Sequence, residues 1–123
     1  PWFTLAAMNW HQLIEERNLE FDRVIISVLR RDPSRLAQVK RWIQRRLEDP
    51  DYSIQSKDGL REWLDVIEKR GVEGVIAVLE GRGEDATRRR QSSPFAVLMP
   101  QDERMKILRR YEALRTRTYP AGV

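Results

Sequence analysis

The chain has 123 residues with no cysteine and one histidine, and its 23 Lys and Arg against 19 Asp and Glu give a formal net charge of +4. This composition excludes disulfides, thiolate metal sites and multi-histidine sites for zinc or haem, and the length fits one domain with a small core. The longest apolar stretch, residues 95–100, falls far short of the ~20 residues that span a bilayer. We therefore expect no membrane segment, and the lack of cysteine favours a cytoplasmic protein.

Residues 1–7, from Pro1 to Ala7, precede Met8 and lack the basic region and long apolar core of a signal peptide. We interpret them as a vector or upstream remnant. The helical domain is then expected over residues 8–117, followed by a flexible tail over 118–123.

Apolar residues recur every three or four positions behind Asn9, a candidate N-cap, which predicts a first helix ending near Arg31. Asp32-Pro33 ends this helix and starts a second one. The predicted buried face of the second helix is Leu36, Val39, Trp42, Ile43 and Leu47. Residues 49–56 combine proline with short polar side chains and predict a loop.

Ser56 or Asp58 is expected to cap a third helix, which Gly71 ends in a left-handed conformation. Its apolar face is predicted to contain Leu60, Trp63, Leu64 and Ile67. A fourth helix from Glu73 to Glu80 is apolar on all sides, which places it at the buried centre of the fold.

Gly81-Arg82-Gly83 breaks the fourth helix, and residues 84–90 predict a short polar helix. The last helix opens at Met99-Pro100, with acidic residues in its first turn and arginines toward its end, as the helix dipole favours. Its predicted apolar stripe is Met105, Leu108, Tyr111 and Leu114. With no alternating strand pattern, the sequence predicts an all-α fold, a single compact domain of five or six helices.

The positive charge is concentrated in the last third of the chain. Residues 82–117 hold ten Lys and Arg against five Asp and Glu, whereas residues 1–81 hold thirteen against fourteen. The run Arg88-Arg89-Arg90 leads directly into a helix-breaking Ser-Ser-Pro segment. We predict a partner-binding surface made of Arg88, Arg89, Arg90, Ser92, Ser93, Arg109 and Arg110.

Two partners suit such a surface. Guanidinium groups match phosphates, so these arginines together with Arg82 could bind nucleic acid. Glu84, Asp85 and Glu112 are close enough in sequence to pair with them, which favours a solvated face or an acidic protein partner. The third and fourth helices have the outline of a helix-turn-helix unit, but the fourth offers no Arg, Lys, Asn or Gln to read bases.

The sequence predicts no catalytic, cofactor-binding or metal-binding residue, and it favours a protein that is not an enzyme. His11 has no distinctive second group nearby and is expected at the surface. Glu15, Glu16 and Glu20 are interpreted as a solvated face neutralised by Arg17 and Arg23. Of the tryptophans, Trp42 and Trp63 are expected in the core, and core and interface both remain open for Trp2 and Trp10.

Residues 89–104, Arg-Arg-Gln-Ser-Ser-Pro-Phe-Ala-Val-Leu-Met-Pro-Gln-Asp-Glu-Arg, resemble a segment of small, mostly uncharacterised helical bacterial proteins associated with toxin–antitoxin-like operons. In these proteins an Arg-Gln-Ser-Ser-Pro-Phe-Ala stretch leads to a Pro-x-x-Glu-Arg helix start. The resemblance implies a structured loop over 91–95 in which the serine hydroxyls cap backbone groups and Phe95 enters the core. It implies a regulatory or binding role and brings no reaction with it.

We therefore interpret the chain as a non-enzymatic helical protein-interaction module, an antitoxin-like or regulatory partner that binds another protein through a basic C-terminal face. The alternative is an auxiliary nucleic-acid-binding protein that contacts phosphates through the arginine-rich patch. The sequence leaves self-association into a homo-oligomer open.

Overall fold

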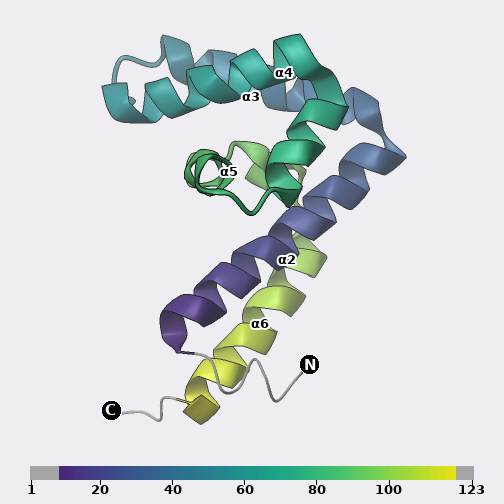
Figure 1. The fold of residues 1–123 in the computed structure, drawn as a ribbon, viewed down its shortest axis with the longest axis vertical. Helices are drawn as coiled ribbons and strands as arrows, with labels where there is room; N and C mark the ends of the chain where they lie inside the picture. Colours follow the sequence, from purple (N-terminus) through teal and green to yellow (C-terminus); the bar gives the residue numbers. More distant parts are fainter. Residues whose placement is uncertain (1–8, 119–123) are drawn as a thin grey trace. The chain divides into compact units, whose positions relative to one another are not determined.

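The computed structural model describes residues 9–118, with side chains as far as Arg115. Within this range the chain forms five α-helices, two 3₁₀ helices and no strand, which confirms the prediction of an all-α domain of five or six helices (Figure 1). In chain order the elements are α2 (Trp10–Arg31), η1 (Pro33–Arg35), α3 (Leu36–Glu48), α4 (Ile54–Glu80), α5 (Glu84–Arg90), η2 (Phe95–Leu98) and α6 (Gln101–Thr118).

Helix α6 extends to Thr118, the first residue of the predicted tail. The predicted remnant over residues 1–7 and the rest of the predicted tail, residues 119–123, lie outside the described residues. Two compact units are distinguished in the chain. The terminal unit combines Pro1–Val24 with Met99–Val123, and the central unit is Ile25–Leu98, so helix α2 begins in the first and ends in the second.

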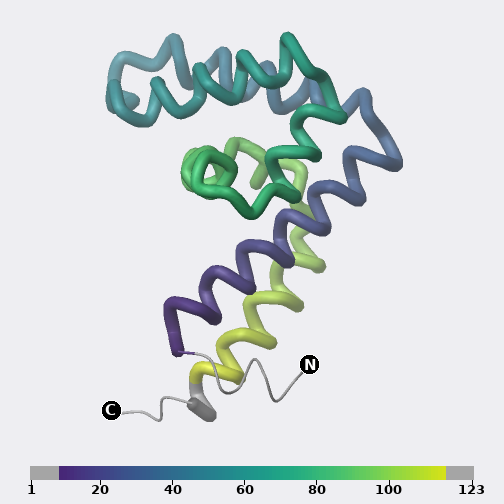
Figure 2. Tube along the Cα trace, viewed as in Figure 1, coloured from purple at the N-terminus to yellow at the C-terminus, as the bar shows by residue number. Residues whose placement is uncertain are grey.

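The terminal unit pairs the first part of α2 with α6. Helix α2 begins as predicted, because Asn9 and Gln12 form a capping box: each backbone N–H donates to the other's side-chain oxygen at 2.9 Å. Figure 2 shows the two helices running side by side. The core between them is formed by Leu13, Ile107, Tyr111 and Leu114, with Trp10, Phe21, Val24 and Met99 partly buried against it.

The predicted stripe of α6 was only partly right. Tyr111 and Leu114 are buried, but Met105 and Leu108 are half-buried, and Ile107 occupies the core position one turn before Tyr111. The reason is geometric: alternating steps of four and three keep residues on one face of an α-helix, whereas repeated steps of three drift around it.

The central unit contains a helical hairpin of α3 and the first half of α4. Asp32 is an N-cap as predicted, since its carboxylate accepts the Ser34 N–H at 3.2 Å. The element that it caps is the 3₁₀ helix η1, which Pro33 opens, and α3 itself begins only at Leu36. Of the predicted buried face, the residues Leu36, Val39 and Ile43 are buried, whereas Trp42 and Leu47 are half-buried. The expectation that Trp42 belongs to the core was therefore wrong in part.

Helix α4 begins earlier than predicted. Its N-cap is Ser53, whose Oγ accepts the Ser56 N–H at 3.1 Å, so the predicted caps Ser56 and Asp58 both lie inside the helix. Ser53 has the extended backbone (φ −65°, ψ 150°) of an N-cap residue. The loop is consequently shorter than residues 49–56, and Ile54 stands exposed in the first turn.

Gly71 interrupts α4 and bends the chain, as the turn in the tube of Figure 2 shows. Its φ of 62° is positive as predicted, but its ψ of −157° belongs to a region that essentially only glycine occupies. The half of α4 beyond Gly71 is the predicted fourth helix. Its residues Val75, Ile76, Val78 and Leu79 are buried, while Ala77 is exposed, so this segment faces the core on most but not all sides.

The backbone at Gly71 predicts a matched pair of alanine substitutions. A Cβ at either Gly71 or Gly83 meets no atom within 4 Å, and only Gly71 has a positive φ. Gly71→Ala should therefore lower the free energy of unfolding by about 1–3 kcal/mol through backbone strain alone. Gly83→Ala should cost less, under about 1 kcal/mol, because the negative φ of Gly83 suits alanine and only the N-cap preference for glycine is lost. Urea denaturation measures both, and equal effects of the two substitutions would contradict this assignment.

Candidate interaction surface

Helix α5 carries the predicted arginine run. The helix starts after Gly83, with Glu84 and Asp85 in its first turn and Arg88, Arg89 and Arg90 in its last. This polarity suits the helix dipole, because carboxylates lie near the positive end and guanidinium groups near the negative end. The predicted short polar helix is thus present, and all three arginines belong to the central unit.

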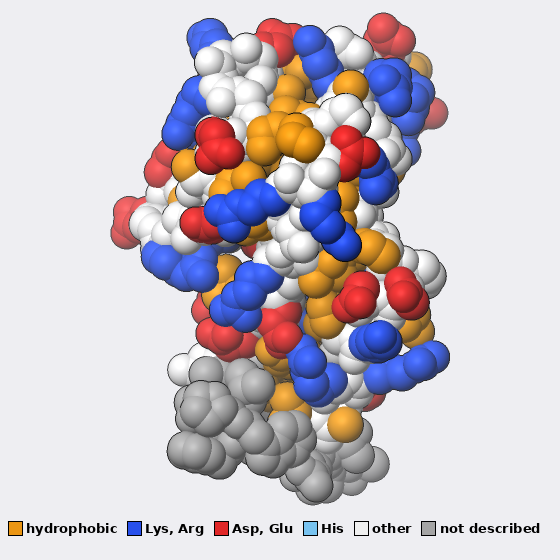
Figure 3. All heavy atoms as spheres, turned by 90° about the vertical axis from the view of Figure 1, so that its right-hand side faces the viewer, with side chains coloured by type: hydrophobic (Ala, Val, Ile, Leu, Met, Phe, Trp, Pro, Cys, Tyr) orange, Lys and Arg blue, Asp and Glu red, His pale blue; other side chains and the backbone are white. Residues whose placement is uncertain are grey.

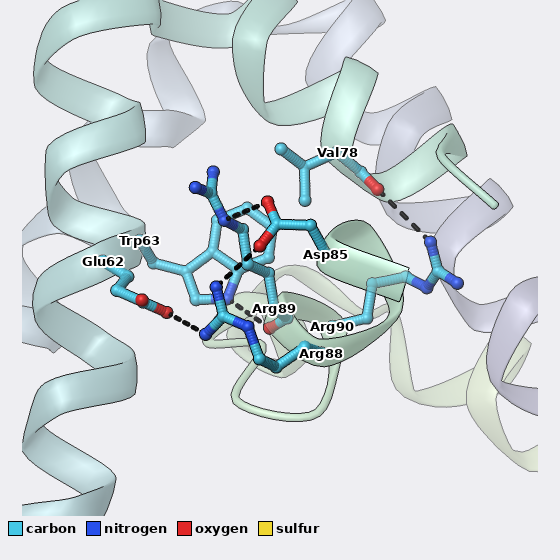
Figure 4. Close-up of polar contacts among 7 residues, drawn as sticks. All are labelled: Glu62, Trp63, Val78, Asp85, Arg88, Arg89 and Arg90. Atoms are coloured by element: carbon cyan, nitrogen blue, oxygen red, sulfur yellow. Dashed lines mark hydrogen bonds and ion pairs between the residues drawn. The ribbon is translucent and has the colours of Figure 1, made fainter. Parts of the chain in front are cut away.

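Arg88 and Arg89 turn toward carboxylates of their own unit (Figure 4). Arg88 binds Glu62 of α4 through Nη1 and Asp85 through Nη2, each at 2.8 Å. Arg89 places its Nε 3.2 Å from the second Asp85 oxygen. Asp85 therefore bridges two arginines, and the Arg88–Glu62 pair joins α5 to α4.

These contacts also shift proton affinities. The hydrogen bond to Glu62, followed by that to Asp85, raises the pKa of Arg88 above its usual range. The hydrogen bond from Arg88 lowers the pKa of the Asp85 carboxyl. Both groups are exposed, so salt screens this cluster. The positive charge of Arg88 and Arg89 is balanced within the unit rather than presented alone.

Arg90 points the other way and contacts main-chain carbonyls at the end of α4 (Figure 4). Its Nη1 donates to the carbonyl of Gly81, the C-cap of α4, and lies 3.4 Å from the carbonyl of Val78. Its Nη2 donates to Thr87 Oγ1 at 3.1 Å. A cation beside the carbonyls at a helix C-terminus, where the helix dipole is negative, stabilises the helix end, so Arg90 acts first as a structural cap.

The last turn of α5 is attached to the core through Trp63. The indole Nε1–H of this buried residue donates to the carbonyl of Arg89 at 2.7 Å, and its ring meets Phe95 edge-on at 4.9 Å between centroids. Trp63 is 1% exposed and Phe95 is 0% exposed, which confirms the predicted core position of Trp63 and the predicted entry of Phe95 into the core.

Ser92 and Ser93 are half-buried, and their backbone N–H groups donate to the carbonyls of Arg89 and Arg90 at 3.1 and 3.2 Å. Within the described residues neither hydroxyl makes a hydrogen bond, so the predicted capping by these hydroxyls is not observed. Ser92 instead packs on Gly59 of α4, where a Cβ would lie 2.6 Å from Ser92 Cβ. The structured loop is present, but backbone hydrogen bonds and packing hold it rather than hydroxyl capping.

Arg110 belongs to the terminal unit, where it pairs with Glu20 of α2, and the hydroxyl of Tyr111 donates to the same carboxylate. The interpretation of Glu20 as a solvated residue was therefore wrong, because α6 supplies partners that sequence distance conceals. Burial of Tyr111, reinforced by its hydrogen bond to Glu20, raises the pKa of the phenol well above its usual range.

Arg109, the other predicted residue of α6, is exposed. Among the described side chains it has no ion-pair partner, and the same holds for Arg104 and Lys106. The predicted site residues therefore fall into two groups, one in each unit. The α5 group is engaged internally, whereas Arg109 remains available to a partner.

The overall charge count of the first two-thirds of the chain conceals a basic helix. Residues 30–46 hold seven Lys and Arg against one acidic residue, Asp32, while residues 48–85 hold five against eleven. Summed over residues 1–81, the positive charge of the first segment and the negative charge of the second cancel. A net charge taken over a window of one helix length separates the two segments. Most of this charge lies on α3. Elsewhere the signs are mixed, as the interleaved blue and red side chains of Figure 3 show for one face.

Within residues 9–118, no helix combines the length and apolar character that a membrane crossing requires. His11 is exposed, as predicted, and the described side chains form no group of three or more His, Asp or Glu that could hold a metal ion. Comparison with protein-family models, curated proteins and solved structures gives no match.

The Tyr111–Glu20 contact predicts a pH-dependent stability. A phenol whose pKa is higher in the folded than in the unfolded state stabilises fully below the unfolded pKa of about 10 and loses this effect as pH rises beyond it. Tyr111→Phe should therefore cost about 1.5–3 kcal/mol of unfolding free energy at neutral pH. The difference from wild type should shrink by up to about 1.4 kcal/mol per pH unit above pH 10.

Urea denaturation at neutral pH and near pH 11 measures this change. Tyr52→Phe is the matched control, because the Tyr52 hydroxyl makes no hydrogen bond with the described residues; its effect at neutral pH should stay within about 0.5 kcal/mol. A Tyr111→Phe penalty that is identical at the two pH values would contradict the assignment.

The close approach of Ser92 to Gly59 predicts a sign reversal in a double-mutant cycle. Gly59→Ala alone should cost about 1–3 kcal/mol of unfolding free energy, because its Cβ displaces Ser92. In a Ser92→Gly background the same change should be neutral or stabilising by up to about 1 kcal/mol, since alanine favours helix over glycine. Additive effects in urea denaturation would show that the two residues do not interact.

Proposed function

We propose that this protein is a non-enzymatic helical interaction module, an antitoxin-like or regulatory partner that binds an acidic region of another protein. One observation carries the proposal: the exposed cations divide into a group that is paired internally and a group that is not. Arg88 and Arg89 pair with carboxylates of the central unit. Arg109 on α6 and Arg41 and Arg45 on α3 are exposed and have no ion-pair partner among the described residues.

Unpaired guanidinium groups on regular helices suit carboxylates of a partner. They form bidentate hydrogen bonds with carboxylates, and helices present them at fixed spacing. Binding through them costs no internal ion pair, whereas binding through Arg88 would first break its contacts with Glu62 and Asp85. The cations available to a partner therefore differ, in each unit, from the arginine run that dominates the sequence.

Nucleic-acid binding through the arginine run receives less support from the same contacts. A phosphate approaching Arg88 or Arg89 also approaches Asp85 and Glu62, which repel it. Arg90 is directed at the carbonyl of Gly81. For the nucleic-acid alternative to hold, phosphates must be bound elsewhere on the chain.

The proposal predicts a nuclease-resistant complex with one protein. The tagged 123-residue chain is used as bait in nuclease-treated extract of its native host, the co-purified protein is identified by mass spectrometry, and the complex is rebuilt from the two purified components. Analytical ultracentrifugation should show a fixed stoichiometry. The expected partner carries an acidic surface, so raising the salt concentration should weaken the complex.

Two outcomes would overturn the proposal. The first is a chain that sediments alone and rebuilds no complex with any captured protein. The second is tight binding to a DNA duplex of about 20 base pairs at about 50 mM salt with a steep salt dependence, while nuclease treatment removes all co-purified material. That second result would establish the nucleic-acid alternative.

A further inference from the structure

Helix α3 carries two stripes with different chemistry. The buried stripe of Leu36, Val39 and Ile43 faces the core of the central unit. A second stripe follows the spacing i, i+3, i+4, i+7 and i+8 and therefore shares another face of the helix. We call this second stripe the α3 basic face; its residues are Gln38, Arg41, Trp42, Arg45 and Arg46.

The charges of the α3 basic face are not neutralised by α4, the helix that packs beside α3 (Figure 1). Lys40, on the flank nearer α4, pairs with Glu68 at 3.4 Å. Arg41, Arg45 and Arg46 form no ion pair with any described side chain, and the single carboxylate within α3 is Glu48 at its last position. Three guanidinium groups are thus displayed within about two turns of helix.

Trp42 supplies the apolar centre of the face. It is half-buried, the guanidinium of Arg46 lies 4.6 Å from its ring centroid, and its indole N–H donates to none of the described residues. A tryptophan held in place by a neighbouring arginine, with its N–H free, is typical of the residues that dominate protein–protein binding energy. Charge and aromatic surface therefore coincide on one face.

We propose that the α3 basic face binds an acidic helix of a partner protein, with carboxylates at three- and four-residue spacing opposite Arg41, Arg45 and Arg46 and an apolar residue against Trp42. This inference rests on the proposed function and names its surface and the chemistry of its partner. The matching spacing of two helices allows successive carboxylates to meet successive guanidinium groups. Burial of the Trp42 edge then adds an apolar contact to charge complementarity.

A single-stranded nucleic acid fits this face less well. Such strands combine phosphate contacts with bases stacked on open aromatic rings. Here Arg46 covers the ring of Trp42, so a base could stack there only by displacing the guanidinium. Carboxylates need no open ring, because they bind the edges of the guanidinium groups and the indole N–H.

The test measures binding of a fluorescein-labelled acidic peptide of about 16 residues, with Glu at i, i+3, i+4 and i+7 and one leucine, by fluorescence anisotropy. The double variant Arg41→Glu/Arg45→Glu should weaken binding by about tenfold or more, and Trp42→Ala by about fivefold. The matched control Arg104→Glu/Lys106→Glu makes the same change in net charge at exposed residues of α6 that the proposed function does not use, and it should weaken binding by less than about threefold.

A peptide of the same composition with its Glu residues clustered should bind the wild-type chain less tightly. Circular dichroism and urea denaturation establish that each variant is folded, and Arg41→Gln/Arg45→Gln replaces the charge reversal if that variant unfolds. Two results would overturn the inference. The first is an equal loss of peptide affinity in the α3 and α6 variants. The second is tighter binding of single-stranded DNA, seen as displacement of the peptide by an equal concentration of the DNA.

The same variants are then added to the rebuilt complex of the proposed function. A complex that forms and is insensitive to substitutions in α3 overturns this inference and leaves the proposed function in place. A chain for which no partner complex can be rebuilt overturns the proposed function itself. The two failures are therefore distinguishable.

Discussion

The hydrogen-bonding requirement of one buried indole organises the central unit. Burying a tryptophan removes roughly 150–250 Å² from water, but its N–H must keep an acceptor or cost about 1–3 kcal/mol. Trp63 is 1% exposed, and its N–H finds that acceptor in the carbonyl of Arg89, 26 residues later in the chain. The end of α5 is thus tied to α4, and the edge-on contact with Phe95 ties the following loop to the same ring.

This tie determines the role of the arginine run. With the carbonyl of Arg89 held against Trp63, the last turn of α5 has one orientation relative to α4. Arg88 then reaches Glu62, and Arg90 reaches the carbonyl of Gly81 at the end of the same helix. The side chains of Arg88 and Arg90 and the main chain of Arg89 consequently serve the packing of α5 on α4, while the Arg89 guanidinium pairs with Asp85 within α5. The arginine run looks most like a binding motif in the sequence, but its contacts lie largely within the central unit.

Local patterns predicted much of the fold, and the failures have physical causes. The first helix, its Asn9 cap and the glycine break at Gly71 depend on neighbouring residues, and the structure shows all of them. The predicted caps of α4 were wrong because several short polar residues in succession compete for one N-cap. Glu20 pairs with Arg110, 90 positions away, and Ser92 packs on Gly59, 33 positions away. No rule based on residue spacing predicts such contacts.

The difference between α5 and α3 shows why charge density alone is a poor guide to a binding surface. Both helices are basic, but α5 lies beside Glu62 and carries Asp85 in its own first turn, whereas the outward stripe of α3 carries arginines and a tryptophan with Glu48 only at its end. Exposed ion pairs contribute little to stability, yet they occupy the hydrogen-bonding groups that a partner would use. A guanidinium group without such a neighbour keeps its donors directed at solvent, so a carboxylate that replaces water there encounters no competing carboxylate. For a chain with a net charge of only +4, the absence of local competition on α3 therefore matters more for binding than the number of arginines in α5.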